Sequence, residues 1–344
     1  MNILIRVDAS VAIGTGHVMR TLTLAELLRD ARCDVRFVMK EEEGHLCSYV
    51  ESRGFSVFRI ASARTQEDDA QATIQAIDAW GERIDWCIVD HYELDARWEE
   101  QVRWYVQNVM VIDDLANRPH VCDVLLDQNY YFDSYARYER LVPANCTLLL
   151  GPKYVLLRKE FTEAREMVRV RTGEVNRLLV FFGGSDPTNE TEKALRALRL
   201  LRPAHVDVVV GATNPRRHVI ERMCSEMGAR YHCQIDYIAE LMARADLAVG
   251  AGGATMWERC FLGLPSLVTV VADNQKVATE AVAAYGAIQY VGWHEHVTTE
   301  RYVEVMKRAL ETPKELVRMS ERSLQLMGTN RERMHPVVRR ILEG

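Results

Sequence analysis

The sequence lacks three features that would mark other classes of protein. It has no excess of positive charge, since 43 lysines and arginines stand against 49 aspartates and glutamates, a formal net charge of -6. This balance argues against general nucleic-acid binding, which usually needs a basic surface. No apolar run approaches the roughly 20 residues of a membrane span. No two of the eight cysteines lie within three residues of each other, so a Cys-x-x-Cys metal or redox motif is excluded.

What remains is typical of a globular protein of the cytoplasm. Hydrophobic residues make up 48% of the chain and charged residues 27%, which excludes a disordered protein. Arg6 and Asp8 interrupt the N-terminal apolar run before a signal-peptide core could form. We therefore expect a cytoplasmic protein with reduced cysteines, no nucleic-acid partner and no membrane partner.

Short apolar runs alternate with helical patterns in both halves of the chain. Residues 3–7, 35–39 and 86–90 are strand-like, residues 18–29 are helical, and a second alternation begins at 177–182. This β-α-β rhythm predicts parallel sheets covered by helices on both faces. At 344 residues the chain is long enough for about two such domains.

We expect four segments. The first, 1–152, is a Rossmann-like domain, and 153–173 is a charged connector. Residues 174–328 form a second Rossmann-like domain that binds the nucleotide, and 329–344 form a terminal helix that could cross back to the first domain. The fold class is α/β, with a phosphorylated ligand held in a cleft between the two domains.

A glycine-rich loop near the N-terminus contains a histidine at the expected start of a helix. Gly14 and Gly16 precede His17, and free backbone N–H groups with a helix dipole attract phosphate there. The dipole disfavours the imidazolium form, so His17 is a candidate general base, the alternative being a helix cap. A nicotinamide site is disfavoured because Met19 occupies the third glycine position of that fingerprint and the loop is long.

A second glycine-rich loop follows the strand-like run 247–249. Gly252 and Gly253 allow backbone N–H groups to approach a diphosphate, and Ala254 and Thr255 open the following helix. Glu258 lies one turn further on, where a carboxylate can accept hydrogen bonds from ribose hydroxyls. The alternative for Glu258 is the acid of a capping box.

Other polar groups follow strands in the same way. Gly183 and Gly184 either face the ligand or form a tight turn, and Asn274 and Gln275 offer amides suited to sugar groups, with an ordinary N-cap as the alternative for Asn274. Two groups of possible metal ligands are Asp113-Asp114 and His294-Glu295-His296. Neither supplies a complete ligand set, so we expect no metal and no cofactor.

Taken together, these motifs resemble those of GT-B glycosyltransferases and, more specifically, of the UDP-sugar hydrolases of pseudaminic acid biosynthesis. The resemblance spans nearly the whole chain, and the order of the motifs makes it specific. The matching segments are Arg6-Val7-Asp8-Ala9-Ser10, Gly14-x-Gly16-His17-x-x-Arg20, Asp90-His91-Tyr92, Asp113-Asp114, Cys122-Asp123-Val124-Leu125-Leu126-Asp127-Gln128-Asn129, Gly151-x-x-Tyr154-x-Leu156-Leu157-Arg158-x-x-Phe161, Phe182-Gly183-Gly184-Ser185-Asp186, Ala251-Gly252-Gly253-Ala254-Thr255-x-Trp257-Glu258 and Asn274-Gln275.

This resemblance implies a GT-B arrangement and hydrolysis of UDP-2,4-diacetamido-2,4,6-trideoxy-β-L-altropyranose. Water attacks the anomeric carbon with inversion, and UDP and the free sugar are released without a metal. His17 matches the base, Tyr92 and Asn274 match residues near the sugar, Ile238 matches the uracil-reading segment, and Glu258 matches the ribose-binding acid. Expected substrate-binding residues are Gly14, Gly16, Arg158, Gly183, Gly184, Ile238, Gly252, Gly253, Ala254, Thr255, Glu258 and Gln275.

Two alternatives remain from the sequence. A glycosyltransferase would pass the sugar to an acceptor hydroxyl, and a nucleotide-sugar binder would lack catalysis, although the presence of His17 argues against the binder. We expect a monomer, because a site between two domains needs no partner chain.

Overall fold

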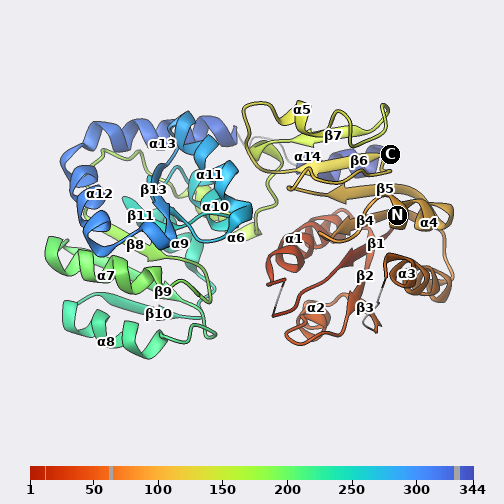
Figure 1. The fold of residues 1–344 in the computed structure, drawn as a ribbon, viewed down its shortest axis with the longest axis horizontal. Coiled ribbons are helices and arrows are strands. Elements are labelled where there is room, and N and C mark those ends of the chain that lie inside the picture. The colour runs from red at the N-terminus through yellow and green to blue at the C-terminus, as the bar shows by residue number, and fades with distance from the viewer. Residues whose placement is uncertain (12, 62–64, 329–333) are drawn as a thin grey trace. The chain divides into compact units, whose positions relative to one another are not determined.

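The computed structural model describes residues 1–11, 13–61, 65–328 and 334–344, which form two compact units. Unit 1 comprises Met1–Leu157 and Arg331–Gly344, and unit 2 comprises Arg158–Asn330. Each unit is a parallel sheet with helices on both faces (Figure 1). The α/β fold with two Rossmann-like units that the sequence predicts is confirmed. Part of the expected terminal segment 329–344 lies outside the described residues, at 329–333.

Unit 1 contains a seven-stranded sheet among the described residues, with the order β3-β2-β1-β4-β5-β6-β7 and every neighbouring pair parallel. Its strands are β1 (Asn2–Val7), β2 (Asp34–Lys40), β3 (Ser56–Ile60), β4 (Ile84–Asp90), β5 (Val106–Ile112), β6 (Val124–Asp127) and β7 (Thr147–Leu150). Its helices are α1 (Gly16–Asp30), α2 (Cys47–Ser52), α3 (Gln66–Trp80), α4 (Ala96–Val102), α5 (Ser134–Tyr138) and α14 (Pro336–Glu343), with short 3₁₀ turns η1 (Arg103–Tyr105) and η2 (Pro152–Tyr154).

Strand β1 is mostly apolar because both faces of the sheet are buried. Ile3 and Ile5 of β1 pack into one core with α1 and α14, while Leu4 points to the opposite core with α3 and α4. This follows from the alternation of side chains along a strand. The terminal helix α14 contributes Val337 to the first of these cores, so it is part of unit 1.

Unit 2 contains a six-stranded parallel sheet within the described part of the chain, in the order β10-β9-β8-β11-β12-β13. Its strands are β8 (Arg177–Phe181), β9 (His205–Val210), β10 (Arg230–Cys233), β11 (Leu247–Ala251), β12 (Ser266–Val270) and β13 (Gln289–Trp293). Its helices are α6 (Lys159–Glu166), α7 (Glu190–Leu201), α8 (Arg217–Met227), α9 (Ile238–Arg244), α10 (Ala254–Phe261), α11 (Asp273–Tyr285), α12 (Thr299–Glu311) and α13 (Pro313–Met327), with the turn η3 (His294–His296).

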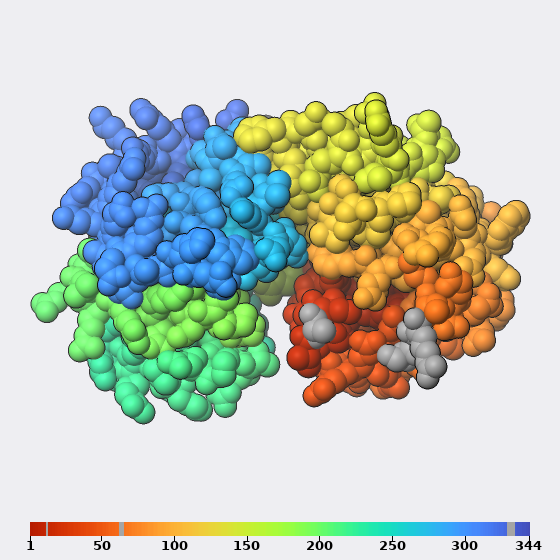
Figure 2. Space-filling view, in the orientation of Figure 1, coloured from red at the N-terminus to blue at the C-terminus, as the bar shows by residue number. Residues whose placement is uncertain are grey.

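Helices α7 and α8 contact each other on unit 2, and they form adjacent green and blue-green bands on its surface in Figure 2. Helix α6, inside the segment expected as a connector, packs against α9 and α10 of the same unit. Within the described ranges, no helix combines the length and the apolar character needed to cross a membrane.

Candidate functional site

The histidine loop joins β1 to α1 in unit 1. The loop closes on itself through a bridge between Ser10 and Gly14, and Gly14 has a positive φ of 80°, which favours glycine. Helix α1 begins at Gly16, and no side chain caps its N-terminus. His17 is therefore the second residue of the helix, at the carboxyl edge of the sheet where parallel α/β folds bind ligands.

His17 is held by a buried carboxylate from the neighbouring strand. Its Nδ1 lies 2.5 Å from Oδ1 of Asp90, the last residue of β4. Because a carboxylate only accepts hydrogen bonds, Nδ1 carries the hydrogen and Nε2 is left as the acceptor. The histidine is mostly buried, with 7% of its surface exposed. This arrangement gives a general base of fixed tautomer, which is what proton abstraction from water requires.

Arg20 completes this ion-pair network one turn further along α1. It donates to Asp90 through Nε at 2.5 Å and Nη2 at 2.6 Å, and to Asp114 through Nη1 at 3.0 Å. Burial would raise the pKa of Asp90, but the charges and hydrogen bonds of Arg20 and His17 outweigh burial and lower it well below its usual range. Asp90 therefore stays ionised at neutral pH and keeps His17 oriented.

Tyr92 lies beside the histidine, two residues after the end of β4. The two rings meet edge to face, with centroids 4.4 Å apart and an interplanar angle of 85°. Gly14, Gly16 and His17 thus lie in the loop and first turn of α1, with Tyr92 in contact with the histidine ring.

A second buried network anchors the strand that leads into the histidine loop. Both Nη atoms of Arg6 donate to the Asp8 carboxylate, at 2.6 and 2.7 Å, and Arg6 also binds Asp69 of α3. Asp8 accepts a further hydrogen bond from the backbone N–H of Lys40 at 2.8 Å. The motif residues Arg6 and Asp8 therefore fix the start of the loop.

The acids at the ends of β5 and β6 have separate partners. Asp113 binds Arg118 at 2.8 Å, whereas Asp114 binds Arg20, so the two adjacent carboxylates do not face one another. Asp127 accepts a hydrogen bond from Tyr138 at 2.9 Å, and burial raises the pKa of Asp127 to about 7. Apart from the motif that contains Asp127, no pattern in the sequence marks this last pair.

In unit 2 the second glycine-rich loop joins β11 to α10. The N-cap of α10 is Gly253, with a φ of 74°, and no side chain caps the first turn. The alternative of a capping box with Glu258 is therefore wrong. The N–H of Gly252 donates to the Thr269 carbonyl oxygen at 3.1 Å. Helix α10 follows from Ala254, and the first N–H groups of a helix have no partner within the helix.

Helix α11 packs against this loop. A Cβ on Gly252 would lie 2.8 Å from the Thr279 hydroxyl and 3.0 Å from Oε1 of Gln275, so only glycine fits there. Gln275 also accepts a hydrogen bond from the N–H of Val271 at 3.2 Å. Asn274 is the second residue of α11, whose N-cap is Ala272, so the N-cap alternative for Asn274 is wrong. Gln275 thus packs against the glycine-rich loop, and Asn274 lies at the same edge of the sheet.

Glu258 meets Arg158, a residue one hundred positions away. Nη2 of Arg158 lies 3.2 Å from Oε1 of Glu258. Burial raises the pKa of Glu258, although the charge of Arg158 acts in the opposite direction. Arg158 therefore opposes the effect of burial on Glu258, whose side chain is only partly exposed.

The loop after β8 has a packing role. The carbonyl oxygen of Gly184 accepts from the N–H of Gly211 at 2.9 Å, and a Cβ on Gly211 would lie 2.6 Å from that oxygen. Asp186 caps α7 by accepting from the N–H groups of Glu190 and Thr191. The loop therefore packs against Gly211, and its glycines lie at the carboxyl edge together with Ile238, the buried first residue of α9.

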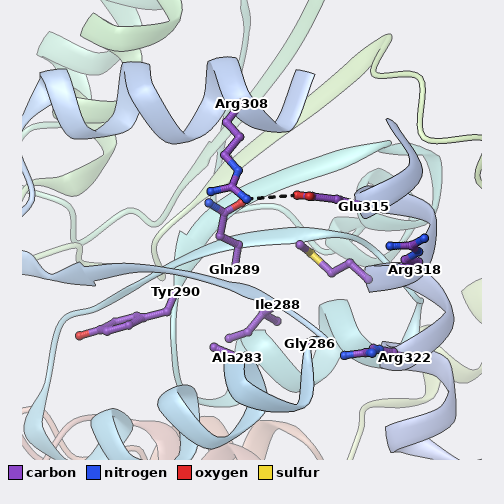
Figure 3. A pocket seen from close by; sticks show the side chains of 10 residues that line it. Ala283, Gly286, Ile288, Gln289, Tyr290, Arg308, Glu315, Arg318 and Arg322 are labelled. Atoms are coloured by element: carbon purple, nitrogen blue, oxygen red, sulfur yellow. Dashed lines mark ion pairs between the residues drawn. The ribbon is translucent and has the colours of Figure 1, made fainter. Parts of the chain in front are cut away.

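A separate cavity of unit 2 lies at the opposite edge of the sheet. It has a volume of about 420 Å³, and its lining includes Gln289 at the start of β13 and the arginines Arg308, Arg318 and Arg322 (Figure 3). Arg308 forms an ion pair with Glu315 at 3.7 Å. None of the residues predicted for the site lines this cavity.

Comparisons with solved structures define the class of the fold. The chain shares its two-domain, GT-B-type fold with MurG of Acinetobacter baumannii, with a TM-score of 0.70, 15% identity and coverage of 100% of this chain and 99% of that one. It is also similar to the structure of LpCGTa in complex with UDP, with a TM-score of 0.67, 10% identity and coverage of 99% and 97%. At these identities the likeness concerns the fold.

Sequence comparisons lead to particular relatives. The chain is 25% identical to the UDP-2,4-diacetamido-2,4,6-trideoxy-β-L-altropyranose hydrolase of Campylobacter jejuni over 287 residues, 83% of this chain and 97% of the relative, which confirms the resemblance inferred from the motifs. It is 25% identical to the spore coat polysaccharide biosynthesis protein SpsG of Bacillus subtilis over 91% of this chain and 90% of the relative.

An uncharacterized protein of Methanocaldococcus jannaschii is 28% identical over 294 residues, which are 80% of this chain. The match spans only 57% of the length of that relative. No protein-family profile matches the chain.

Proposed function

We propose that the protein hydrolyses a UDP-linked diacetamido sugar of the 2,4,6-trideoxy-altropyranose type to UDP and the free sugar. The observation that supports this most strongly is the pair formed by His17 and Asp90, with 2.5 Å between Nδ1 and Oδ1. The pair supplies a base at a ligand-binding sheet edge. Similarity to the Campylobacter jejuni hydrolase supports the choice of substrate.

In the proposed reaction Nε2 of His17 accepts a proton from water as the water oxygen attacks the anomeric carbon. The bond between that carbon and the β-phosphate oxygen breaks, and its electron pair leaves with UDP. Attack from the side opposite UDP inverts the configuration. Asp90 stabilises the imidazolium that forms, and the proton later passes to solvent. Tyr92 and Asn274 position the sugar.

Unit 2 supplies the binding of the UDP group in this proposal. The N–H groups of Gly253, Ala254 and Thr255 receive the diphosphate and stabilise its growing negative charge. Glu258, held by Arg158, accepts hydrogen bonds from the ribose, and the backbone at Ile238 reads the uracil. Because UDP is already a good leaving group, no general acid and no metal is needed.

A second candidate is a glycosyltransferase, because the chain shares its fold with the spinosyn rhamnosyltransferase SpnG. In that case the same histidine would take the proton from an acceptor hydroxyl instead of from water. The two functions differ only in the nucleophile.

The deciding experiment measures UDP release from the diacetamido-altrose nucleotide in EDTA without any acceptor, with UDP-N-acetylglucosamine as comparison. We expect release from the first substrate and its loss in His17→Ala. A matched control is His120→Gln, since His120 also pairs with a buried carboxylate, Glu99, at 2.6 Å, but lies near the amino end of β6. Release only after an acceptor is added would assign the protein to the transferases.

A further inference from the structure

A buried arginine lies beneath the glycine-rich loop of unit 2. Arg259 of α10 is 1% exposed, and its Nη2 donates to the carbonyl oxygen of Ala251 at 2.5 Å. Its Nη1 donates to the Thr255 hydroxyl at 3.2 Å. A Cβ on Gly250 would lie 2.3 Å from the Phe181 carbonyl oxygen and 2.8 Å from Nη1, so the glycine leaves room for both the neighbouring strand and the guanidinium. Arg259 thus contacts the strand end and the first turn that frame the loop.

No ion pair within 4.0 Å balances the positive charge of Arg259 among the residues that the structure describes, and its Nε has no hydrogen-bond partner. The Glu258 carboxylate attracts Arg259 only at longer range, and it is itself paired with Arg158. Burial lowers the pKa of Arg259 to about 10, so it stays charged at neutral pH. A buried, unpaired charge is unfavourable unless another charge compensates for it.

The position of Arg259 on its helix makes the imbalance larger. Its guanidinium reaches back to the first turn of α10, where the helix dipole is positive. A cation is disfavoured at that end of a helix, whereas an anion is favoured. An anion bound at the loop would compensate both the dipole and the arginine.

A second buried arginine of unit 2, Arg171, is stabilised by carbonyl oxygens at helix C-termini. Arg171, 7% exposed, donates to the carbonyl oxygens of Met242, Ala245 and Leu262, at or beyond the C-terminal ends of α9 and α10. Cations are favoured at helix C-termini, so packing and capping account for Arg171 fully. They do not account for Arg259.

We propose that Arg259 is a positioning residue that makes the loop at Gly253–Thr255 selective for a diphosphate. It shapes the loop through Ala251 and Thr255 and adds buried positive charge, without itself touching the ligand. This inference rests on the proposed function in placing a nucleoside diphosphate at the loop. It adds that binding depends on the second phosphate far more than on the nucleoside.

Isothermal titration calorimetry with UDP, UMP and uridine tests this on the full chain. In Arg259→Gln we expect UDP to bind at least tenfold more weakly, UMP to lose less, and uridine to change less than twofold. The matched control Arg171→Gln is expected to lower thermal stability while leaving all three affinities within twofold. Equal losses for UDP and uridine in Arg259→Gln, or an unchanged affinity for UDP, would overturn the proposal.

Two further measurements cover the remaining outcomes. If Arg259→Gln does not fold, Arg259→Lys is used instead, because lysine keeps the positive charge but lacks the planar guanidinium. In that variant the affinity for UDP should fall at least threefold while the affinity for uridine stays unchanged. An equal fall in the affinities for UDP and uridine would overturn the proposal. Inorganic pyrophosphate should raise the melting temperature of the natural protein, and no rise contradicts the inference. One outcome separates the inference from the proposed function. If pyrophosphate raises the melting temperature, Arg259→Lys reduces that rise, and the natural protein releases no UDP from the sugar nucleotide, then the proposed function is refuted and the inference is supported.

Discussion

Replacing Asp90 by asparagine removes the charge that orients and stabilises His17 while preserving the shape of the side chain. Asp90 is fully buried and lies 2.5 Å from Nδ1 of His17. With charge centres about 4 Å apart and an effective dielectric constant of about 20, the carboxylate stabilises an imidazolium by about 4 kcal/mol. At about 1.4 kcal/mol per factor of ten, complete loss would slow the reaction roughly a thousandfold. Since Arg20 shares the carboxylate, we expect kcat to fall roughly 100- to 1000-fold with KM nearly unchanged.

The same substitution has a stability signature with a defined pH range. Its partners lower the pKa of Asp90 below the unfolded value of about 3.9, so the stabilisation is complete above that value and is lost as the pH falls below it. The cost of Asp90→Asn, about 2–4 kcal/mol because Arg20 keeps Asp114, should therefore diminish as the pH is lowered from about 5 towards 2. Urea denaturation across that range measures it.

Glu99→Gln is the matched control, because Glu99 is also fully buried and holds His120 at 2.6 Å. We expect that variant to lose stability and to keep its kcat. A kcat for Asp90→Asn within threefold of the natural protein, or an equal loss in the control, would refute the role assigned to Asp90.

Three further substitutions test the fold and the loop. Because the pKa of Asp127 is raised to about 7, ionisation of this carboxyl destabilises the fold as the pH rises from about 4 to 7. In urea denaturation, Asp127→Asn should raise the unfolding free energy at pH 8 by roughly 1–3 kcal/mol more than at pH 5. An equal effect at both pH values would contradict this. Gly173→Ala places a Cβ 2.1 Å from the Pro313 carbonyl oxygen and should lower the unfolding free energy by about 3 kcal/mol or more. The control Gly228→Ala, at a similar positive φ but with no close neighbour, should lower it by only about 1 kcal/mol. Similar melting temperatures for the two variants would argue against the clash. Gly252→Ala places a methyl group 2.8 Å from a threonine hydroxyl of α11, so calorimetry should show UDP binding at least tenfold weaker, and unchanged binding would exclude the loop.

The alternation of strands and helices could be predicted from the sequence because most strands are buried on both faces. Four of the five residues from Ile3 to Val7 are apolar for that reason, the exception being Arg6. The edge strand β10, Arg230–Cys233, carries no such signal because its side chains are exposed or half-buried. Helix α13 was likewise not predicted from the sequence.

Site residues could be predicted where a loop motif marks them, as with His17 and Glu258. Their partners could not, because the pairing of Glu258 with Arg158 and of His17 with Asp90 depends on segments that are distant in the sequence. Arg259 was missed because it looks like any charged helical residue, and only its burial and the absence of a carboxylate partner among the described residues distinguish it.

The central claim is that water attacks the anomeric carbon. The most direct test runs the reaction in ¹⁸O-labelled water and measures the masses of both products by mass spectrometry. The account predicts that the label appears in the hydroxyl at the anomeric carbon of the free sugar and that UDP carries none. Label in the β-phosphate of UDP would show that the phosphorus–oxygen bond breaks, and would contradict the role assigned to His17.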